Sequence, residues 1–187
     1  MGKLNIIELP LLGSYIVAPN IFEDERGSFS RVLCQDEMAH IHQGDFLQVN
    51  HSITRKKGTV RGMHFQYPPY SEVKLVKCIK GSIMDIIIDI RTGSPTFLKS
   101  HQEILSAQNM KSIYIPKGFA HGFQTLEDDT ELLYFHSMVY TPGNEGALSI
   151  HDPLLNIKWP LDITNVSKKD AQHHFINIDF KGVDIEL

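Results

Sequence analysis

The chain has 187 residues, two cysteines, ten histidines and a formal net charge of −4. This length favours a single domain spanning residues 1–187, which is large enough to bury a hydrophobic core of its own. Apolar residues make up 42% and charged residues 21% of the sequence, which excludes a disordered, collagen-like or coiled-coil protein. The negative charge disfavours nucleic acid and membrane surfaces as partners, and two cysteines exclude a disulfide framework. Histidine serves both metal binding and proton transfer, so its abundance leaves a choice between those two chemistries.

The sequence contains no segment that resembles a membrane span or a secretory signal. No apolar run approaches the roughly 18 residues that a transmembrane helix needs. Pro10 and Gly13 interrupt the only apolar stretch near the N-terminus, which a signal peptide would keep continuous. We therefore expect a cytoplasmic protein whose cysteines, Cys34 and Cys78, stay reduced.

Short runs rich in β-branched and aromatic residues alternate with turn residues along the whole chain. They predict strands at 15–18, 27–33, 46–54, 58–65, 74–80, 82–91, 99–105, 112–115, 122–126, 131–140 and 146–151. In 82–91 the even positions from Met84 to Ile90 are apolar and the odd positions include Asp85 and Asp89, so one face is predicted to be in the core. A helix is predicted at 35–42, and Ser167 can cap a short helix that follows it. The pattern is typical of an antiparallel all-β sandwich or barrel with a short helical C-terminal tail.

Basic residues concentrate in one part of this acidic chain. Seven lie between Asn50 and Lys80, against a single acid, Glu72. Three of them, at 55–57, fit an exposed hairpin tip, whereas Arg61 and Lys74 each lie inside an apolar strand. Because a buried cation needs a partner, these two predict a site for an anionic small molecule.

Four positions in the middle of the chain resemble the metal site of the cupin barrel, a jelly-roll fold. Cupin metal sites commonly take a His-x-His pair, a Glu six residues before a Gly, and the last residue of Pro-x-Gly-x-x-His. The corresponding residues here are His64, Gln66, Lys74 and His121. A protonated lysine has no lone pair to offer, and two imidazoles alone are a poor metal site. We therefore expect a cupin barrel that needs no metal ion; the family resemblance described below further implies that it needs no organic cofactor.

The same residues suit proton abstraction beside a carbonyl group. His64 can act as the base, and Lys74 can stabilise the oxygen on which negative charge develops. An epimerase also needs an acid on the opposite face, and Tyr134, inward-facing if its strand has the expected orientation, is a plausible donor. A core aromatic residue explains Tyr134 equally well.

Longer motifs make the resemblance specific: the sequence is similar to the dTDP-4-dehydrorhamnose 3,5-epimerase family of sugar-nucleotide cupins. The match extends from about Asn20 to Asp170. The segments that carry it include Asp24-Glu25-Arg26-Gly27, Gln48-Val49-Asn50-His51-Ser52, Val60-Arg61-Gly62-Met63-His64-Phe65-Gln66, Pro116-Lys117-Gly118-Phe119-Ala120-His121, Leu133-Tyr134 and Ser167-Lys168-Lys169-Asp170.

The resemblance implies a role for each matching residue. His64 corresponds to the base, Asp170 to its carboxylate partner, Tyr134 to the general acid and Lys74 to the cation near the C4 oxygen of the sugar. The implied substrate-binding residues are Arg26, Gln48, Asn50, Arg61, Gln66, His121, Glu145 and Lys169. The family acts as a homodimer in which the residue matching Arg26 reaches the nucleotide across the interface.

Three positions depart from the family pattern. Arg31 stands where the family commonly has Glu near the nucleotide, so we count it among the substrate-binding candidates and leave the nucleobase open. Phe135 replaces a common Lys on the face away from Tyr134. His136 replaces a small residue on the face of Tyr134 and could contact the sugar, or it could be structural. We expect surface or structural roles for His173 and His174, because adjacent residues point apart.

The sequence thus predicts an isomerase that inverts C3 and C5 of a nucleotide-linked 4-keto-6-deoxyhexose, most plausibly dTDP-4-dehydro-6-deoxy-D-glucose, through an enolate. Within the same scaffold, an epimerase acting at one carbon or a ketoisomerase remains open. A metal-dependent cupin oxygenase and a non-catalytic sugar-nucleotide binding module are the alternatives of another class.

Overall fold

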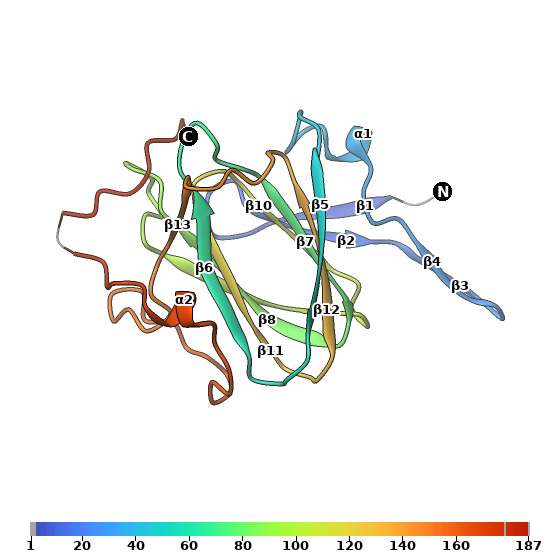
Figure 1. The fold of residues 1–187 in the computed structure, drawn as a ribbon. Helices are drawn as coiled ribbons and strands as arrows, with labels where there is room; N and C mark the ends of the chain where they lie inside the picture. Colours follow the sequence, from blue (N-terminus) through green and yellow to red (C-terminus); the bar gives the residue numbers. More distant parts are fainter. Residues whose placement is uncertain (1–2, 178, 187) are drawn as a thin grey trace.

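The computed structural model describes residues 3–177 and 179–186 and consists mainly of two antiparallel sheets packed face to face (Figure 1). The six-stranded sheet has the order β1-β2-β10-β7-β12-β5 and the five-stranded sheet the order β13-β6-β11-β8-β9. The strands of the first sheet are β1 (Leu4–Glu8), β2 (Tyr15–Pro19), β10 (Ser112–Ile115), β7 (Lys74–Lys80), β12 (Thr130–His136) and β5 (Gln48–Thr54). Those of the second are β13 (Glu145–Ala147), β6 (Val60–Gln66), β11 (Phe119–Thr125), β8 (Ser82–Asp89) and β9 (Ser100–Ser106).

Three smaller elements lie outside these sheets. A hairpin of β3 (Ile21–Asp24) and β4 (Gly27–Ser30) projects from the barrel. The helices α1 (Gln35–Met38) and α2 (Lys168–Ala171) have four residues each. Among the described residues, none of the helices has the length and apolar character needed to cross a membrane.

The main hydrophobic core lies between the two sheets. Val76, Ile113 and Leu132 come from the six-stranded sheet and pack against Ile83 and Phe123 of the five-stranded sheet. All of these side chains are at most 2% exposed. The all-β prediction with a short C-terminal helix is therefore confirmed.

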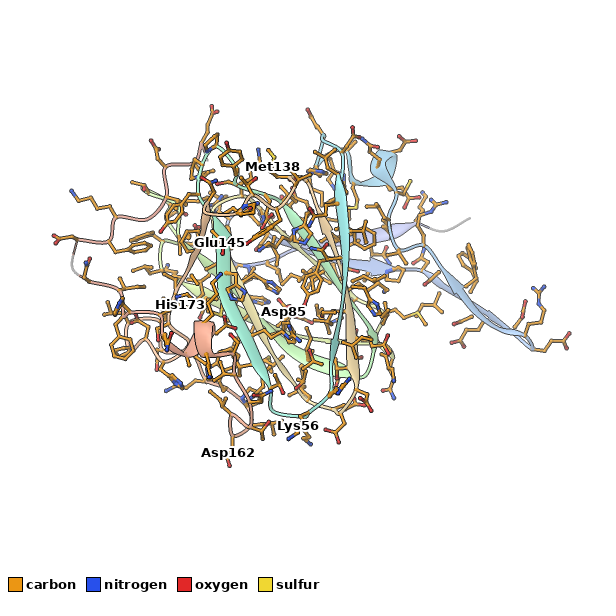
Figure 2. All side chains as sticks on the ribbon, in the orientation of Figure 1. Lys56, Asp85, Met138, Glu145, Asp162 and His173 are labelled. Atoms are coloured by element: carbon orange, nitrogen blue, oxygen red, sulfur yellow. The ribbon has the colours of Figure 1, made fainter. Side chains whose placement is uncertain are left out.

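A second core covers the outer face of the five-stranded sheet. Ile86, Ile88 and Ile90 pack there against the C-terminal segment, including Leu148 and Leu155. Of the even positions predicted for this core face, Ile86, Ile88 and Ile90 are buried and Met84 is partly buried. The odd positions are also buried, however, because they face the inner core; Asp85 and Asp89 are both fully buried. Figure 2 shows Asp85 in the interior and Lys56 at an exposed turn.

Several element boundaries differ from the predictions. The helix predicted at 35–42 ends at Met38 and continues as turns. The strand predicted at 131–140 ends at His136, where Leu47 N–H bonds to the His136 carbonyl, and the chain then leaves the sheet. The strands β1 and β3 were not predicted, because β3 is wholly exposed and β1 alternates only partly buried positions.

Candidate active site

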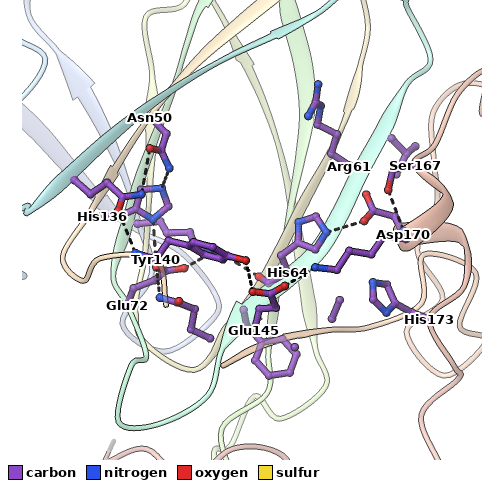
Figure 3. A pocket seen from close by; sticks show the side chains of 18 of the residues that line it. Asn50, Arg61, His64, Glu72, His136, Tyr140, Glu145, Ser167, Asp170 and His173 are labelled. Carbon is purple, nitrogen blue, oxygen red and sulfur yellow. Dashed lines mark hydrogen bonds and ion pairs between the residues drawn. The ribbon is translucent and has the colours of Figure 1, made fainter. Parts of the chain in front are cut away.

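A cavity of about 910 Å³ opens between the two sheets at one end of the barrel (Figure 3). Residues of β5, β6 and β7, the connection after β12, and the α2 region line it. Nine of the residues that the sequence singled out are in this lining: Gln48, Asn50, Arg61, His64, Gln66, Lys74, Glu145, Lys169 and Asp170. The cavity thus gathers segments more than 100 positions apart in the sequence.

His64 and Asp170 form a hydrogen-bonded pair in one wall. His64 extends from β6, and its Nε2 lies 3.0 Å from Asp170 Oδ1. The Asp170 side chain is 6% exposed and the His64 side chain 44%. Ser167 explains why Asp170 is held there, since its Oγ accepts a hydrogen bond from Asp170 N–H at 3.0 Å and caps α2. The cap predicted at Ser167 is confirmed.

The charge of Asp170 sets the tautomer of His64. Burial alone would raise the pKa of Asp170, but the hydrogen bond and charge of His64, with the bond from Ser167, hold that pKa below its ordinary value. A carboxylate only accepts hydrogen bonds, so the proton on His64 Nε2 points at Asp170. In the neutral ring the lone pair is then on Nδ1, which is the atom able to take a proton.

Lys74 lies in the opposite sheet, where it is paired with a carboxylate. Its Nζ is 3.0 Å from Glu72 Oε1 and 3.4 Å from the backbone oxygen of His64. The Glu72 side chain is 8% exposed and also accepts a 2.8 Å hydrogen bond from Gln66 Nε2. Burial would raise the pKa of Glu72, but His136 and Lys74 together hold it below its usual value. The expectation that a buried Lys74 needs a partner is confirmed, and Glu72 is that partner.

His136 completes the polar wall around Glu72. Its Nδ1 lies 3.4 Å from Glu72 Oε2, and its Nε2 is 3.3 Å from Asn50 Nδ2. Asn50 is oriented by Gln48 Nε2, which donates to Asn50 Oδ1 at 3.1 Å, and Gln48 in turn accepts a bond from Tyr140 N–H. These donors leave Nε2 of His136 as an acceptor, so its ring proton faces Glu72. His136 therefore lines the cavity as part of a fixed network.

Two tyrosines lie near the cavity in different environments. The Tyr134 hydroxyl is 3.2 Å from Ser52 Oγ, and its ring stacks on His136 and meets His121 edge to face. Burial raises the pKa of Tyr134 and keeps its proton in place. Tyr140 lines the cavity directly, with its hydroxyl 2.5 Å from Glu145 Oε2.

Comparison with known proteins decides the family. The model of the family described as dTDP-4-dehydrorhamnose 3,5-epimerase matches residues 8–177. An enzyme of that name from Shigella flexneri is 38% identical over 180 residues, which is 95% of this chain and 99% of the relative. This chain belongs to the dTDP-4-dehydrorhamnose 3,5-epimerase family.

Solved structures of similar proteins support the same family assignment. The enzyme RmlC from Legionella pneumophila, in complex with dTDP-4-keto-L-rhamnose, has a TM-score of 0.92 and 34% identity, covering 99% of this chain and 100% of that one. A 3′-monoepimerase from Streptomyces bikiniensis, in complex with dTDP-quinovose, has a TM-score of 0.84 and 30% identity, covering 90% of this chain and 86% of that one. The fold expected for this epimerase family is thereby confirmed.

Four residues that the family resemblance singled out do not line the cavity. His121 is 5% exposed and binds Asp85 Oδ2 at 2.7 Å, so it lies beneath the site. Tyr134 lies beside it, with its ring stacked on that of His136. Arg31 forms an ion pair with Glu37 of α1, and Arg26 pairs with Asp24 at the tip of the β3–β4 hairpin. Within a single copy of this epimerase-family chain, neither arginine reaches the cavity.

Sequence reasoning gave no role to three ionisable residues that line the cavity: Glu72, Tyr140 and His173. For Glu72, the isolated acid within a basic segment was a usable signal. For His173, the expectation of a surface or structural role did not anticipate its place in the cavity lining, against the His64–Asp170 pair. Its position shortly after the end of α2, three residues beyond Asp170, was the available signal, which the adjacent His174 obscured.

Proposed function

We propose that this protein inverts C3 and C5 of dTDP-4-dehydro-6-deoxy-D-glucose and yields dTDP-4-dehydro-L-rhamnose. Its family supports this assignment, as does the chemistry of the cavity. The substrate carries a 4-keto group, which makes the hydrogens on the two neighbouring carbons acidic. One base can therefore serve both centres.

The reaction begins with a proton transfer to His64. Nδ1 takes the proton from the carbon, and the C–H electron pair moves toward the C4 oxygen to form an enolate. Asp170 stabilises the imidazolium that results, and Lys74 stabilises the oxyanion. Glu72 keeps the Lys74 ammonium in place with its 3.0 Å contact. The enolate then collapses as its carbon receives a proton from the opposite face, which inverts the centre.

The proposal rests mainly on one observation: the base, His64, lies on one sheet, and the cation, Lys74, lies on the sheet that faces it. His64 extends from β6 of the five-stranded sheet, whereas Lys74 and Tyr134 belong to β7 and β12 of the six-stranded sheet. A sugar between the sheets would present one face to His64 and the other to β12. Inversion requires this two-sided arrangement, because a donor beside the base would return the proton to its original face.

Tyr134 is the proposed acid on the second face. Burial keeps it protonated, as a donor must be. A further structure of the Streptomyces bikiniensis 3′-monoepimerase carries replacements of one histidine and one tyrosine that are 70 positions apart, the spacing of His64 and Tyr134. Tyr140 is the second candidate, because it lines the cavity and already donates to Glu145.

Polar and basic residues at the rim suit the diphosphate and nucleoside of the substrate. Arg61 lines the cavity and is held by Thr54 Oγ1 at 3.2 Å. Gln48, Asn50 and Lys169 lie along the same rim. We propose that a homodimer completes the site, with Arg26 at the tip of the hairpin reaching the cavity of a second copy. A cytoplasmic location fits a nucleotide-sugar substrate and belongs to the same proposal.

Epimerisation at a single carbon is the second candidate, because the Streptomyces bikiniensis enzyme is a 3′-monoepimerase of the same fold. His64, Lys74 and Tyr134 can serve either reaction. The number of carbons that exchange hydrogen with solvent separates the two.

The role of His64 is tested by His64→Asn. We expect the conversion of dTDP-4-dehydro-6-deoxy-D-glucose, followed by NMR of the product, to slow by on the order of 10³-fold, within the range of general-base effects. His151→Asn is the matched control, since His151 is exposed and outside the cavity lining; its rate should equal that of the unmodified protein. Conversion by His64→Asn within tenfold of the control would reject His64 as the base.

A further inference from the structure

His64, Asp170 and His173 form a cluster whose composition is that of a metal site. One side-chain ligand atom from each residue lies within 4.8 Å of the other two. Figure 3 shows His173 beside Asp170, on the side of the cavity where His64 also lies. The set differs from the usual cupin metal positions, because two of its members come from the C-terminal segment rather than from the barrel strands.

His173 supplies a second, independent observation. Its Nε2 atom is buried and has no hydrogen-bond partner among the described residues. A neutral imidazole has one ring nitrogen with a lone pair that can bind a ligand. A buried polar atom without a partner is uncommon and calls for an explanation.

The distances suit a metal ion after a small rearrangement. Metal–ligand bonds of roughly 2.0–2.2 Å place neighbouring ligands about 3.0–3.5 Å apart. The 3.0 Å separation of His64 Nε2 and Asp170 Oδ1 already meets this requirement. The 4.8 Å bound on the third ligand leaves His173 to approach by about 1.5 Å, which a rotation of its ring can supply.

We propose that His64, Asp170 and His173 bind a late first-row divalent cation, with Zn²⁺ as the representative ion, and that this ion inhibits the enzyme. Two imidazoles and one carboxylate favour zinc, cobalt or nickel over Mg²⁺ and Ca²⁺, which prefer oxygen ligands. The open positions of the ion would face the cavity. The bound ion is regulatory in effect and plays no part in the epimerisation itself.

The ion would inhibit the enzyme because it occupies one nitrogen atom of His64 and thereby changes the protonation of the other. A metal ion on Nε2 displaces the hydrogen that faces Asp170, and the neutral ring then carries its proton on Nδ1. No proton is lost overall, but the lone pair that accepts the substrate proton is gone. This consequence depends on the proposed role of His64 as the base, whereas metal binding itself does not.

Calorimetric titration with ZnCl₂ tests the site without measuring catalysis. The full-length protein, freed of metal with a chelator, should bind one Zn²⁺ per chain, and His173→Asn should weaken that binding at least tenfold. His174→Asn is the matched control: it removes the adjacent, exposed imidazole and should leave the affinity unchanged. Circular dichroism checks that both variants are folded. The absence of one-to-one binding, or equal affinities in the two variants, would overturn the proposal.

A second titration uses Co²⁺ as a spectroscopic probe and remains informative even if His173→Asn does not fold. Co²⁺ should broaden the imidazole NMR signals of His64 and His173 and leave those of the exposed His40, next to α1 and remote from α2, sharp; equal broadening of all three would show only non-specific binding and contradict the site. Zn²⁺ should also inhibit the unmodified enzyme, reversibly with EDTA. In His173→Asn, inhibition relative to its own metal-free rate should require at least tenfold more Zn²⁺. Binding without inhibition would retain the site and reject His64 as the base.

Discussion

The cavity contains two buried carboxylates that stay charged by different means. Asp170 is paired with the neutral or protonated imidazole of His64, whereas Glu72 is surrounded by Lys74, Gln66 and His136. In both cases burial disfavours the charged form of the carboxyl group. The neighbouring groups outweigh this effect, so the pKa of each carboxyl lies below its usual value. The carboxylates thus fix the orientation of the base in one sheet and of the cation in the other.

Replacing the two tyrosines separately identifies the acid. If Tyr134 protonates the enolate, Tyr134→Phe should still exchange substrate hydrogen with deuterated solvent, because His64 is intact, yet inversion should fall by on the order of 10²-fold or more. Tyr140→Phe should reduce both reactions together and mildly, through weaker binding. The measurement is the ratio of exchange to inversion by NMR. The opposite pattern would assign the acid to Tyr140.

At the scale of elements, the backbone of β6 and β11 determines where His64 lies. His64 is directly opposite His121 in this strand pair, and the register shifts between His121 and Phe123. Gly122 makes this close approach feasible, since a Cβ atom there would clash with Met63 Sδ and lie 2.8 Å from the Arg61 carbonyl oxygen and 3.0 Å from Gly62 Cα. The last two contacts are with backbone atoms, which have little freedom to move.

Gly122→Ala should therefore lower the free energy of unfolding by roughly 1–3 kcal/mol, the usual cost of overpacking. The activity should fall as well, because β6 carries His64. Gly44→Ala is the control, since its Cβ would contact only the His42 ring at 3.5 Å. Urea denaturation measures both variants. Equal stability losses would show that the approach of β6 and β11 is not constrained as described.

The sequence was informative wherever function depends on a residue type within a strand. His64, Lys74 and Arg61 are identifiable because a polar side chain in an apolar strand has few explanations. Glu72 precedes β7 in a turn-rich segment, so its contact with Lys74 and His136 depends on a loop path that periodicity does not describe. Strand periodicity placed His136 on the same face as Tyr134, but it could not identify Glu72 as the partner of His136. The C-terminal segment packs back across β6, which explains why the position of His173 was missed.

At the scale of the whole molecule, the β3–β4 hairpin projects from the barrel (Figure 1), and every residue of β3 is exposed. The hairpin carries Phe22 and Phe29, which are 46% and 65% exposed. Such side chains on a projecting hairpin suit contact with a second copy, as proposed for Arg26. The net charge of −4 describes the molecule as a whole. It does not reveal that two basic residues, Arg61 and Lys74, line the same cavity.

Sedimentation equilibrium tests the dimer. The unmodified protein should sediment as a dimer, and Phe29→Asp should raise the dimer dissociation constant at least tenfold, because a charge would be buried in an apolar contact. Leu154→Asp, at a side chain 62% exposed elsewhere on the surface, is the control and should remain dimeric. A monomeric unmodified protein, or equal dissociation of the two variants, would exclude the hairpin interface.

Counting the deuterium incorporated by the unmodified enzyme is the most direct test of the central claim. The substrate is dTDP-4-dehydro-6-deoxy-D-glucose in D₂O, and NMR of the product reports each carbon separately. Epimerisation through an enolate at both centres predicts one deuterium at C3 and one at C5, with both configurations inverted. Deuterium at a single carbon would restrict the enzyme to that centre, and its absence from both carbons would contradict the proposed reaction.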